Sequence, residues 1–554
     1  MDEIKQNSIV DLKVPSSVAF AKVFGGKQVI EVFPFDFQPI CVTYDDHGYE
    51  HISNKGRKRR IVRFCPIETG EYKVQFFDKQ GNIVEEKSYI SNSSTFQKPL
   101  KIKNGKGYDE NGKYFLPIGI NLAFPERFQD SSGAEFGTRE SFSTLGLRKY
   151  ESWIKKVAQN GVNLVRIWCG SFYLTPEKEE LGTFDYTKFT LLDKIFEIAN
   201  KYNVRLKLTI DTFRHFVDDS TNGIQKNIFH KYATYKGKIV NDKEWLNEEK
   251  YRQLWLKKLE EYKLRYACNP AFYALEFWNE MNCYGDMNIQ ELSNWNAYMA
   301  ERAREMFPNA ILLNSIGSLD CDFSLKMYNG FCFEKFDWLQ IHSYLDQGAT
   351  YPEVQVNSIE GLKKCLTVLK DKQNQTGKPF FVAETGAVND CHSGPFRYYS
   401  FDNECLIFVD CVYAPFFLGC LSTGNIWHWD SRYVSSKNLY SLFKPIQKLM
   451  ENVEFDKENF VPIDLSNDKF YCLLLKGNTQ YLAFIRNKFF DWKNILRDEK
   501  APKSQNTEIT FESIGAKDLQ CIRIWKKEKG RVKLENGNIC ISALSRGVLL
   551  KGSL

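Results

Sequence analysis

The chain has 554 residues, of which 43% are apolar and 26% are charged, fractions ordinary for a globular protein. At roughly 100–200 residues per domain, this length predicts about three domains. Gly (34) and Pro (17) are too few for collagen-like or disordered sequence, and the net charge of +6 is close to balance. Aromatic residues reach 15%, which favours large cores and some surface that stacks on flat ligands.

No targeting or membrane segment stands out. Residues 1–6 contain no basic stretch followed by an apolar one, so no secretory signal is predicted and we expect a cytoplasmic protein. The longest apolar passage, 406–421, is interrupted by Asp410 and Pro415 and is too short to cross a bilayer. The 15 Cys are scattered singly without a C-x-x-C pair, which is typical of reduced core residues.

One basic run, residues 55–60, could mark a nucleic-acid surface. Strand-like residues Ile61, Val62 and Phe64 follow at once, and this favours a loop that connects two strands. We therefore predict no nucleic-acid partner.

The two ends of the chain share a pattern of short strands. The alternating runs 29–33, 61–64 and 72–76, with a hairpin-type turn at 78–82, predict an immunoglobulin-like β-sandwich over residues 1–97. The runs 470–475, 481–485 and 521–525 predict a second β-sandwich over 453–554.

The middle of the chain, residues 98–452, alternates short apolar runs with amphipathic helices such as 189–202 and 251–266. Alternation of this kind predicts repeated βα units around a parallel sheet. We expect eight strands within 115–121, 164–168, 206–211, 272–280, 311–315, 338–342, 380–384 and 424–429. The fold predicted is therefore α/β, a (β/α)8 TIM barrel flanked by two β-sandwiches. A doubly wound open sheet is the alternative, but no Gly-rich loop follows an early strand.

In such a barrel the reactive groups stand at the C-terminal ends of the strands. The polar residues found there are Asn121, Arg166, Asp211, Asn279 with Glu280, Asn314, His342 with Tyr344, Glu384, and Trp427 or Trp429. Glu280 and Glu384 end the fourth and seventh strands, which face each other across the barrel mouth. Two carboxylates in one site are what glycosidic cleavage needs.

Other chemistries lack their motifs. Among the seven His, the H-x-x-x-H spacing occurs at His47 and His51, inside the predicted N-terminal β-sandwich and away from the strand ends of the barrel, so a metal hydrolase is disfavoured and no metal or cofactor is expected. No G-x-S-x-G elbow is present for an acyl-transfer serine.

Several strand motifs carry a family resemblance. The segment 277–282 (FWNEMN) resembles the Asn-Glu motif of clan A glycoside hydrolases, most closely family 5, and 382–386 (VAETG) resembles their nucleophile strand. The runs 164–168, 341–344 and 427–429 resemble the second, sixth and eighth strands of the same clan. The region 59–77 resembles the small β-domain that precedes the barrel in some bacterial glycosidases.

This resemblance implies a retaining mechanism on β-linked oligosaccharides of mannan or glucan type. Glu280 would be the general acid/base and Glu384 the nucleophile, with their carboxyl groups about 5–5.5 Å apart. The residues implied in substrate binding, directly or by orienting the nucleophile, are Arg166, Asn279, His342, Tyr344, Trp427 and Trp429. Their place at or after predicted strand ends adds Asn121 and His215 as candidates. Alternation puts one of Trp427 and Trp429 inside the site, and we favour Trp429 because it directly precedes a loop.

Plainer alternatives remain open at this point. The two Glu could form rim salt bridges, Arg166 an interior ion pair, and His342 a satisfied core position. His215, His392 and His428 follow strand ends and are candidate subsite residues or ordinary loop residues. At the level of function, the alternatives are a catalytically silent sugar-binding protein and a transglycosylase that shares the glycosyl-enzyme. The sequence assigns neither the sugar nor the oligomeric state.

Overall fold

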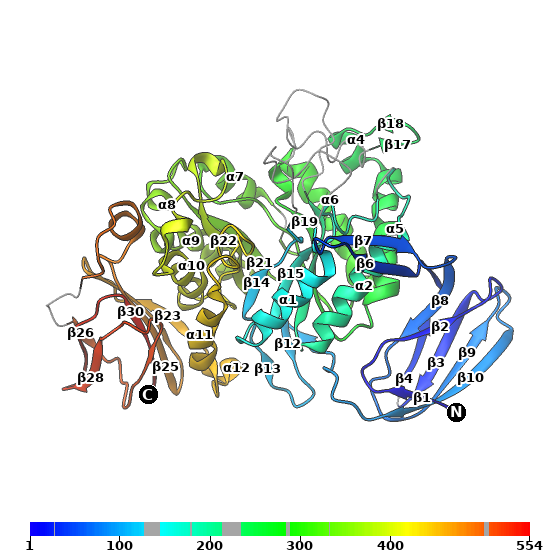
Figure 1. Cartoon of the computed structure of the whole chain (residues 1–554), viewed down its shortest axis with the longest axis horizontal. Helices are drawn as coiled ribbons and strands as arrows, with labels where there is room; N and C mark the ends of the chain where they lie inside the picture. Colours follow the sequence, from blue (N-terminus) through cyan, green and yellow to red (C-terminus); the bar gives the residue numbers. More distant parts are fainter. Residues whose placement is uncertain are drawn as a thin grey trace.

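The computed structural model describes residues 1–26, 28–126, 144–177, 180–212, 234–283, 288–331, 333–503 and 509–554. Three regions follow one another along the long axis of the molecule (Figure 1). A β-rich N-terminal region (blue) and a β-rich C-terminal region (orange to red) flank a central region of parallel strands and helices. This is the predicted architecture, a TIM barrel between two β-sandwiches.

The N-terminal region is built from two facing sheets and a separate hairpin. The sheets have the strand orders β1-β10-β9-β3-β4 and β2-β8-β5, and β6 pairs with β7. In β9, Tyr72, Val74 and Phe76 are buried while Glu71 and Lys73 are exposed, which is the alternation of a half-buried strand. The strands are β1 (Asp2–Lys5), β2 (Val10–Lys13), β3 (Phe20–Gly25), β4 (Gln28–Val32), β5 (Phe35–Phe37), β6 (Ile40–Tyr44), β7 (Glu50–Asn54), β8 (Arg59–Phe64), β9 (Gly70–Phe77) and β10 (Ile83–Asn92). The basic run 55–60 links β7 to β8, as predicted.

The β6–β7 hairpin leaves the sandwich and packs on the barrel. Glu50, at the start of β7, accepts hydrogen bonds from the Leu147 backbone N–H (2.7 Å) and the Tyr173 hydroxyl (2.6 Å). Burial raises the pKa of Glu50. The N-terminal region is therefore anchored at the helix and loop that follow the first two barrel strands.

Seven of the eight predicted barrel strands are regular. The first five form one parallel sheet, β14-β15-β16-β19-β20, and β21 pairs in parallel with β22. Their bounds are β14 (Gly119–Asn121), β15 (Leu164–Trp168), β16 (Arg205–Thr212), β19 (Phe272–Asn279), β20 (Ile311–Leu313), β21 (Leu339–Asp346) and β22 (Phe380–Val388). Before them, a small sheet of β11 (Lys101–Lys103), β12 (Lys106–Tyr108) and β13 (Tyr114–Phe115) leads from the sandwich into the barrel.

The predicted eighth strand, 424–429, is an irregular segment that nevertheless closes the barrel. The Asn425 and Trp427 backbone N–H groups donate to carbonyls of β22, and the Asn121 N–H of β14 donates to the Ile426 carbonyl. A single parallel bridge joins Thr385 to Ile426. This segment therefore occupies the position of the eighth strand without forming a regular ladder.

A helix follows each strand position. These helices are α1 (Gly146–Ala158), α2 (Tyr186–Lys201), α5 (Glu249–Tyr266), α6 (Ile289–Met306), α7 (Asp322–Gly330), α9 (Ser358–Thr376), α10 (Leu406–Phe417) and α11 (Phe443–Met450). The predicted helices 189–202 and 251–266 correspond to α2 and α5. The Asp185 side chain caps α2 by accepting from the Thr187 backbone N–H. Shorter elements are the β17–β18 hairpin (Thr234–Tyr235, Lys238–Ile239), α4 (Asp242–Asn247), α8 (Pro352–Val356) and α12 (Phe455–Glu458).

Helix α10 accounts for the long apolar passage in the sequence. All its residues are buried because it lies between β22 and the C-terminal sheet. Asp410 on this helix forms a buried ion pair with Arg486 of β25 (Gln480–Asn487), with N–O distances of 2.8 and 3.1 Å. Within the described ranges, no helix combines the length and the hydropathy that crossing a membrane requires.

The C-terminal region serves two cores at once. Its larger sheet, β23-β24-β25-β30-β27, faces the barrel on one side and the sheet β26-β29-β28 on the other. In β24, Tyr471 and Leu473 join the barrel core, while Cys472 and Leu474 join the sandwich core. This explains why the run has no polar face. The remaining bounds are β23 (Val461–Asp464), β24 (Phe470–Lys476), β26 (Ile509–Glu512), β27 (Gln520–Arg523), β28 (Arg531–Glu535), β29 (Asn538–Ser542) and β30 (Gly547–Ser553).

Candidate active site

Arg166, on the second barrel strand β15, is the centre of the polar network inside the barrel. Its guanidinium makes five hydrogen bonds, one for each of its N–H groups. It donates to Glu384 Oε1 (2.5 Å), Asn279 Oδ1 (2.7 Å) and Asn121 Oδ1 (3.1 Å), and to both oxygens of Glu276 (2.7 and 3.0 Å). This buried cation therefore fixes the strand-end residues of β14, β19 and β22 relative to one another.

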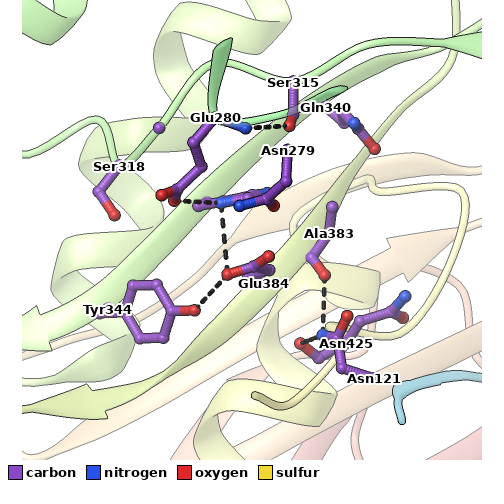
Figure 2. Close-up of polar contacts among 12 residues, drawn as sticks. Asn121, Asn279, Glu280, Ser315, Ser318, Gln340, Tyr344, Ala383, Glu384 and Asn425 are labelled. Carbon is purple, nitrogen blue, oxygen red and sulfur yellow. Dashed lines mark hydrogen bonds and ion pairs between the residues drawn. The ribbon is translucent and has the colours of Figure 1, made fainter. Parts of the chain in front are cut away.

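Glu384, on the seventh strand β22, is held at both carboxylate oxygens. Oε1 accepts from Arg166, and Oε2 accepts from the Tyr344 hydroxyl at 2.6 Å (Figure 2). Burial raises the pKa of Glu384, whereas His342, Arg166 and the Tyr344 hydroxyl act in the opposite direction because they favour the charged form. The predicted contacts of Arg166 and Tyr344 with Glu384 are both present.

Glu280 follows β19 and has a left-handed backbone, with φ of 49°. Its N–H donates to Ser315 Oγ at 2.9 Å, which fixes this strained turn. Oε1 lies 2.5 Å from His342 Nδ1, and the Cys283 thiol approaches Oε2 at 3.8 Å. Burial raises the pKa of the Glu280 carboxyl. Unlike Glu384, Glu280 has no hydrogen bond to Arg166 among the contacts of the described residues.

His342, on the sixth strand β21, lies between the two carboxylates. Its Nδ1 is 2.5 Å from Glu280 Oε1 and 3.4 Å from Glu384 Oε2. Burial lowers the pKa of His342 to about 4, so the ring is neutral near pH 7 and donates a single N–H. One carboxylate oxygen of Glu280 and one of Glu384 lie within 4.8 Å of each other and of this nitrogen.

The same three groups have donor types that could bind a metal ion. The geometry offers a cation little room, because Arg166 and Tyr344 already contact the two oxygens of Glu384.

Asn121 was predicted to bind substrate, but its side chain contacts protein groups instead. It is fully buried, and its amide NH₂ donates to the backbone carbonyls of Ala383 and Asn425 at 3.0 Å (Figure 2). Its Oδ1 accepts from Arg166. Because both ends of the amide meet protein groups, Asn121 orients Arg166 and the closing segment of the barrel and does not reach a substrate.

The two tryptophans after β22 are ordered opposite to the prediction. Trp429 is 2% exposed and packs edge-on against Trp153 of α1. Trp427 is partly exposed, and its ring centroid lies 4.8 Å from that of Trp168, which in turn lies 5.7 Å from the Arg166 guanidinium. The preference for Trp429 as the residue inside the site was therefore wrong, because that side chain fills the gap between strand and helix.

Two further strand ends serve the scaffold. Asp211 of β16 accepts from Lys258 and from the indole N–H of Trp255, both on α5. Asn314 after β20 donates to Asn296 of α6.

His428 is buried against Tyr399, and burial lowers its pKa to about 3. His215 lies outside the described residues.

A layer of charge beneath the site has no counterpart in the sequence prediction. Glu276 of β19 is buried and accepts from Arg166, from Lys207 Nζ (3.1 Å), from Gln340 Nε2 (2.7 Å) and from Thr209 Oγ1 (2.8 Å). These cations hold the pKa of Glu276 far below its usual range, while burial lowers the pKa of Lys207 to about 7. The available signal was Glu276 within the otherwise apolar run 272–278 and Lys207 between two leucines of β16.

Comparisons with known proteins agree with this architecture. The model of the cellulase family (glycosyl hydrolase family 5) matches residues 129–400, and no curated protein matches the sequence. Among solved structures, a candidate glycoside hydrolase from Bacteroides vulgatus is 12% identical over 100% of both chains, with a TM-score of 0.55.

Two other solved structures are less similar. A glycoside hydrolase family 5 protein from Bacteroides vulgatus is 11% identical, with 82% of this chain and 93% of that chain covered and a TM-score of 0.49. An endo-1,4-β-D-mannanase from Thermotoga petrophila is 16% identical, with 56% and 88% covered and a TM-score of 0.39.

Proposed function

Because this chain belongs to glycosyl hydrolase family 5 through residues 129–400, and is thus a retaining O-glycosyl hydrolase, we propose that it cleaves β-linked oligosaccharides of mannan or glucan type. In this proposal the reaction is a double displacement in which Glu384 is the nucleophile and Glu280 is the general acid/base.

One observation carries the proposal, namely the pairing of two carboxylates in unequal surroundings. One oxygen of each carboxylate lies within 4.8 Å of the other, which is compatible with the spacing of about 5–5.5 Å between the two carboxyl groups of a retaining enzyme. Glu384 accepts from a guanidinium and a phenol, which favours its ionised form. Glu280 has no such hydrogen bond to the guanidinium, and burial raises its pKa, which suits a proton donor. Burial raises the pKa of Glu384 as well, so the direct ion pair with Arg166 is what distinguishes the two carboxyl groups.

In the first step, a Glu384 oxygen attacks the anomeric carbon while Glu280 gives its proton to the glycosidic oxygen, so the leaving sugar departs as a neutral alcohol. A covalent glycosyl ester on Glu384 results. In the second step, Glu280, now ionised, takes a proton from water. The water oxygen attacks the anomeric carbon and restores the Glu384 carboxylate with net retention.

The neighbours of the pair fit supporting parts in this reaction. The Tyr344 hydroxyl and Arg166 stabilise the Glu384 carboxylate as it departs in the second step. His342, which is neutral, shares a hydrogen bond with Glu280 through Nδ1 and orients it. In this proposal the Asn279 amide, fixed by its bond to Arg166, binds the sugar 2-hydroxyl, and the partly exposed Trp427 ring stacks on the C–H face of the sugar.

A substrate panel with a stereochemical readout tests this proposal. Aryl β-glycosides of mannose, glucose, xylose and galactose are incubated with the enzyme, and proton NMR follows the anomer released first. We expect hydrolysis of the mannoside or glucoside with the β-anomer appearing first. Glu384→Gln is the inactive control. An α-anomer as first product, or no turnover of any β-glycoside, overturns the proposal.

Product analysis separates hydrolysis from transfer. The glycosyl ester on Glu384 is common to both outcomes, so the acceptor in the second step decides between them. We expect free sugar as the main product at low substrate concentration. A predominance of longer oligosaccharides would identify a transglycosylase instead.

A further inference from the structure

A second polar cluster lies beside the catalytic pair. It consists of Ser318 and Asp320, in the segment after β20, Asp346 at the end of β21, and His392 of the short 3₁₀-helix Asp390–His392 after β22. These residues come from the fifth, sixth and seventh βα connections. Neither the resemblance to the family nor the catalytic mechanism above uses them.

The imidazole of His392 holds this cluster together. Its Nδ1 lies 3.2 Å from Asp346 Oδ2, and its Nε2 lies 3.1 Å from Ser318 Oγ and 3.3 Å from Asp320 Oδ2. The ring also meets the ring of Tyr344 edge-on, with centroids 5.5 Å apart. Since Tyr344 donates to Glu384, one aromatic ring separates His392 from the nucleophile.

The two aspartates of the cluster differ in what remains available to a ligand. Asp346 is buried, and its oxygens accept from the backbone N–H groups of Gly348, Cys391 and His392, so it anchors the loop. The side chains of Asp320 and His392 are 21% and 39% exposed. Asp320 and the outer edge of the imidazole, with Ser318, thus form the part of the cluster that faces outward.

The cluster and the partly exposed tryptophan come from different strand positions around the catalytic pair. Trp427 and Trp168 belong to the eighth and second strand positions, whereas the cluster follows the fifth to seventh strands. Figure 2 shows Ser318 beside the Glu280 carboxylate, with Glu384 between Ser318 and Asn121. Asp320 and His392 are also close enough to Glu280 for their charges to act on its carboxyl group.

We propose that Ser318 and Asp320, held in place by His392, form the subsite for the leaving-group sugar and bind its hydroxyl groups. This inference rests on the proposed function, because it takes Glu280 as the group that protonates the glycosidic oxygen. A carboxylate and a hydroxyl offer a charged and a neutral partner for adjacent sugar hydroxyls, while both ring nitrogens of His392 already contact Asp346, Ser318 and Asp320. This polar subsite suits a sugar as the leaving group.

The test compares two leaving groups on the same glycosyl unit. The probes are β-1,4-mannobiose and cellobiose, and the 2,4-dinitrophenyl β-glycosides of mannose and glucose, whose leaving group needs neither a proton nor sugar contacts. We expect Asp320→Ala to lower kcat/KM on the disaccharide by about 10- to 100-fold, the loss of a charge-assisted hydrogen bond. The kcat/KM of Asp320→Ala on the dinitrophenyl glycoside should stay within about threefold of the wild-type value, because that probe does not use the subsite.

Controls separate this subsite from a structural role and from failure of the function itself. Asp45→Ala, at an exposed aspartate of the N-terminal hairpin, is the matched control. It should leave kcat/KM unchanged on both the disaccharide and the dinitrophenyl glycoside. Melting temperatures identify a variant that is merely misfolded. In the Glu384→Gln background, calorimetry should show weaker disaccharide binding when Asp320→Ala is added. Equal losses on both probes, or none on either, overturn the subsite, whereas a wild-type enzyme inactive on every glycoside overturns the proposed function.

Discussion

The guanidinium of Arg166 donates to Glu384 Oε1 across 2.5 Å, and both side chains are buried. A buried pair of this kind costs desolvation on both sides, so removal of one partner leaves an uncompensated charge. The first prediction concerns this pair. Arg166→Met should lower kcat/KM by about 10²- to 10³-fold, because Glu384 loses the donor that favours its charged form.

The pH profile distinguishes this electrostatic effect from simple unfolding. Without the cation, the pKa of Glu384 rises further, so the acid limb of kcat/KM should move to higher pH. Arg166→Lys keeps the positive charge but cannot make five hydrogen bonds. Its kcat/KM should therefore lie between those of Arg166→Met and the wild type. Arg486→Lys, at a buried ion pair remote from the site, should change the melting temperature and leave the acid limb in place.

A second prediction concerns Glu276, the counter-ion beneath Arg166. Glu276→Gln leaves Arg166 and Lys207 facing each other across a neutral amide, and should destabilise the protein by about 3–5 kcal/mol. Adding Lys207→Met removes one of the two cations and should restore part of that loss. A double-mutant cycle by denaturant unfolding measures the coupling, and strictly additive effects would count against a shared network.

The third prediction uses the raised pKa of Glu280. A raised pKa keeps the acid protonated to higher pH, so activity on poor leaving groups should fall as pH rises through that pKa. Activity should also fall at low pH, as Glu384 becomes protonated. Glu280→Gln should lose about 10²- to 10⁴-fold on disaccharides. Formation of the glycosyl-enzyme from a dinitrophenyl glycoside, followed as a burst of phenolate, should persist.

The fourth prediction separates the two tryptophans. Trp427→Ala should raise KM or lower kcat/KM about twofold to tenfold and cost less stability than Trp429→Ala, because its ring is only partly buried. Trp429→Ala empties a core position and should cost about 3–5 kcal/mol of stability. Unfolding curves and disaccharide kinetics on both variants check the assignment. If Trp429→Ala impaired disaccharide kinetics and Trp427→Ala mainly lowered stability, Trp429 would be the substrate-binding residue instead.

The rule that reactive residues lie at the C-terminal ends of the barrel strands was sufficient to predict which residues contact one another. Glu280, Glu384, Arg166, His342 and Tyr344 lie in one contact network because parallel strands bring their C-terminal ends to one edge of the barrel. Helical periodicity likewise predicted α2 and α5 to within a few residues at their ends.

Other features depend on tertiary contacts that the sequence pattern does not encode. The alternation rule did not separate Trp427 from Trp429, because segment 424–429 forms no regular ladder. Asn121 is a polar strand end like the others, but backbone carbonyls of the neighbouring strand positions saturate its amide. Glu276 stands within an apolar run, and only the fold brings Arg166 and Lys207 to it.

The identity of the nucleophile is the central claim, and covalent trapping tests it most directly. A 2-deoxy-2-fluoro glycoside with a dinitrophenyl leaving group forms the glycosyl ester but hydrolyses it slowly, so the labelled enzyme can be digested and its peptides analysed by mass spectrometry. The account predicts one added fluoroglycosyl group on the peptide that contains Glu384, and none on Glu384→Gln. A label on any other residue, or turnover without a covalent adduct, would contradict it.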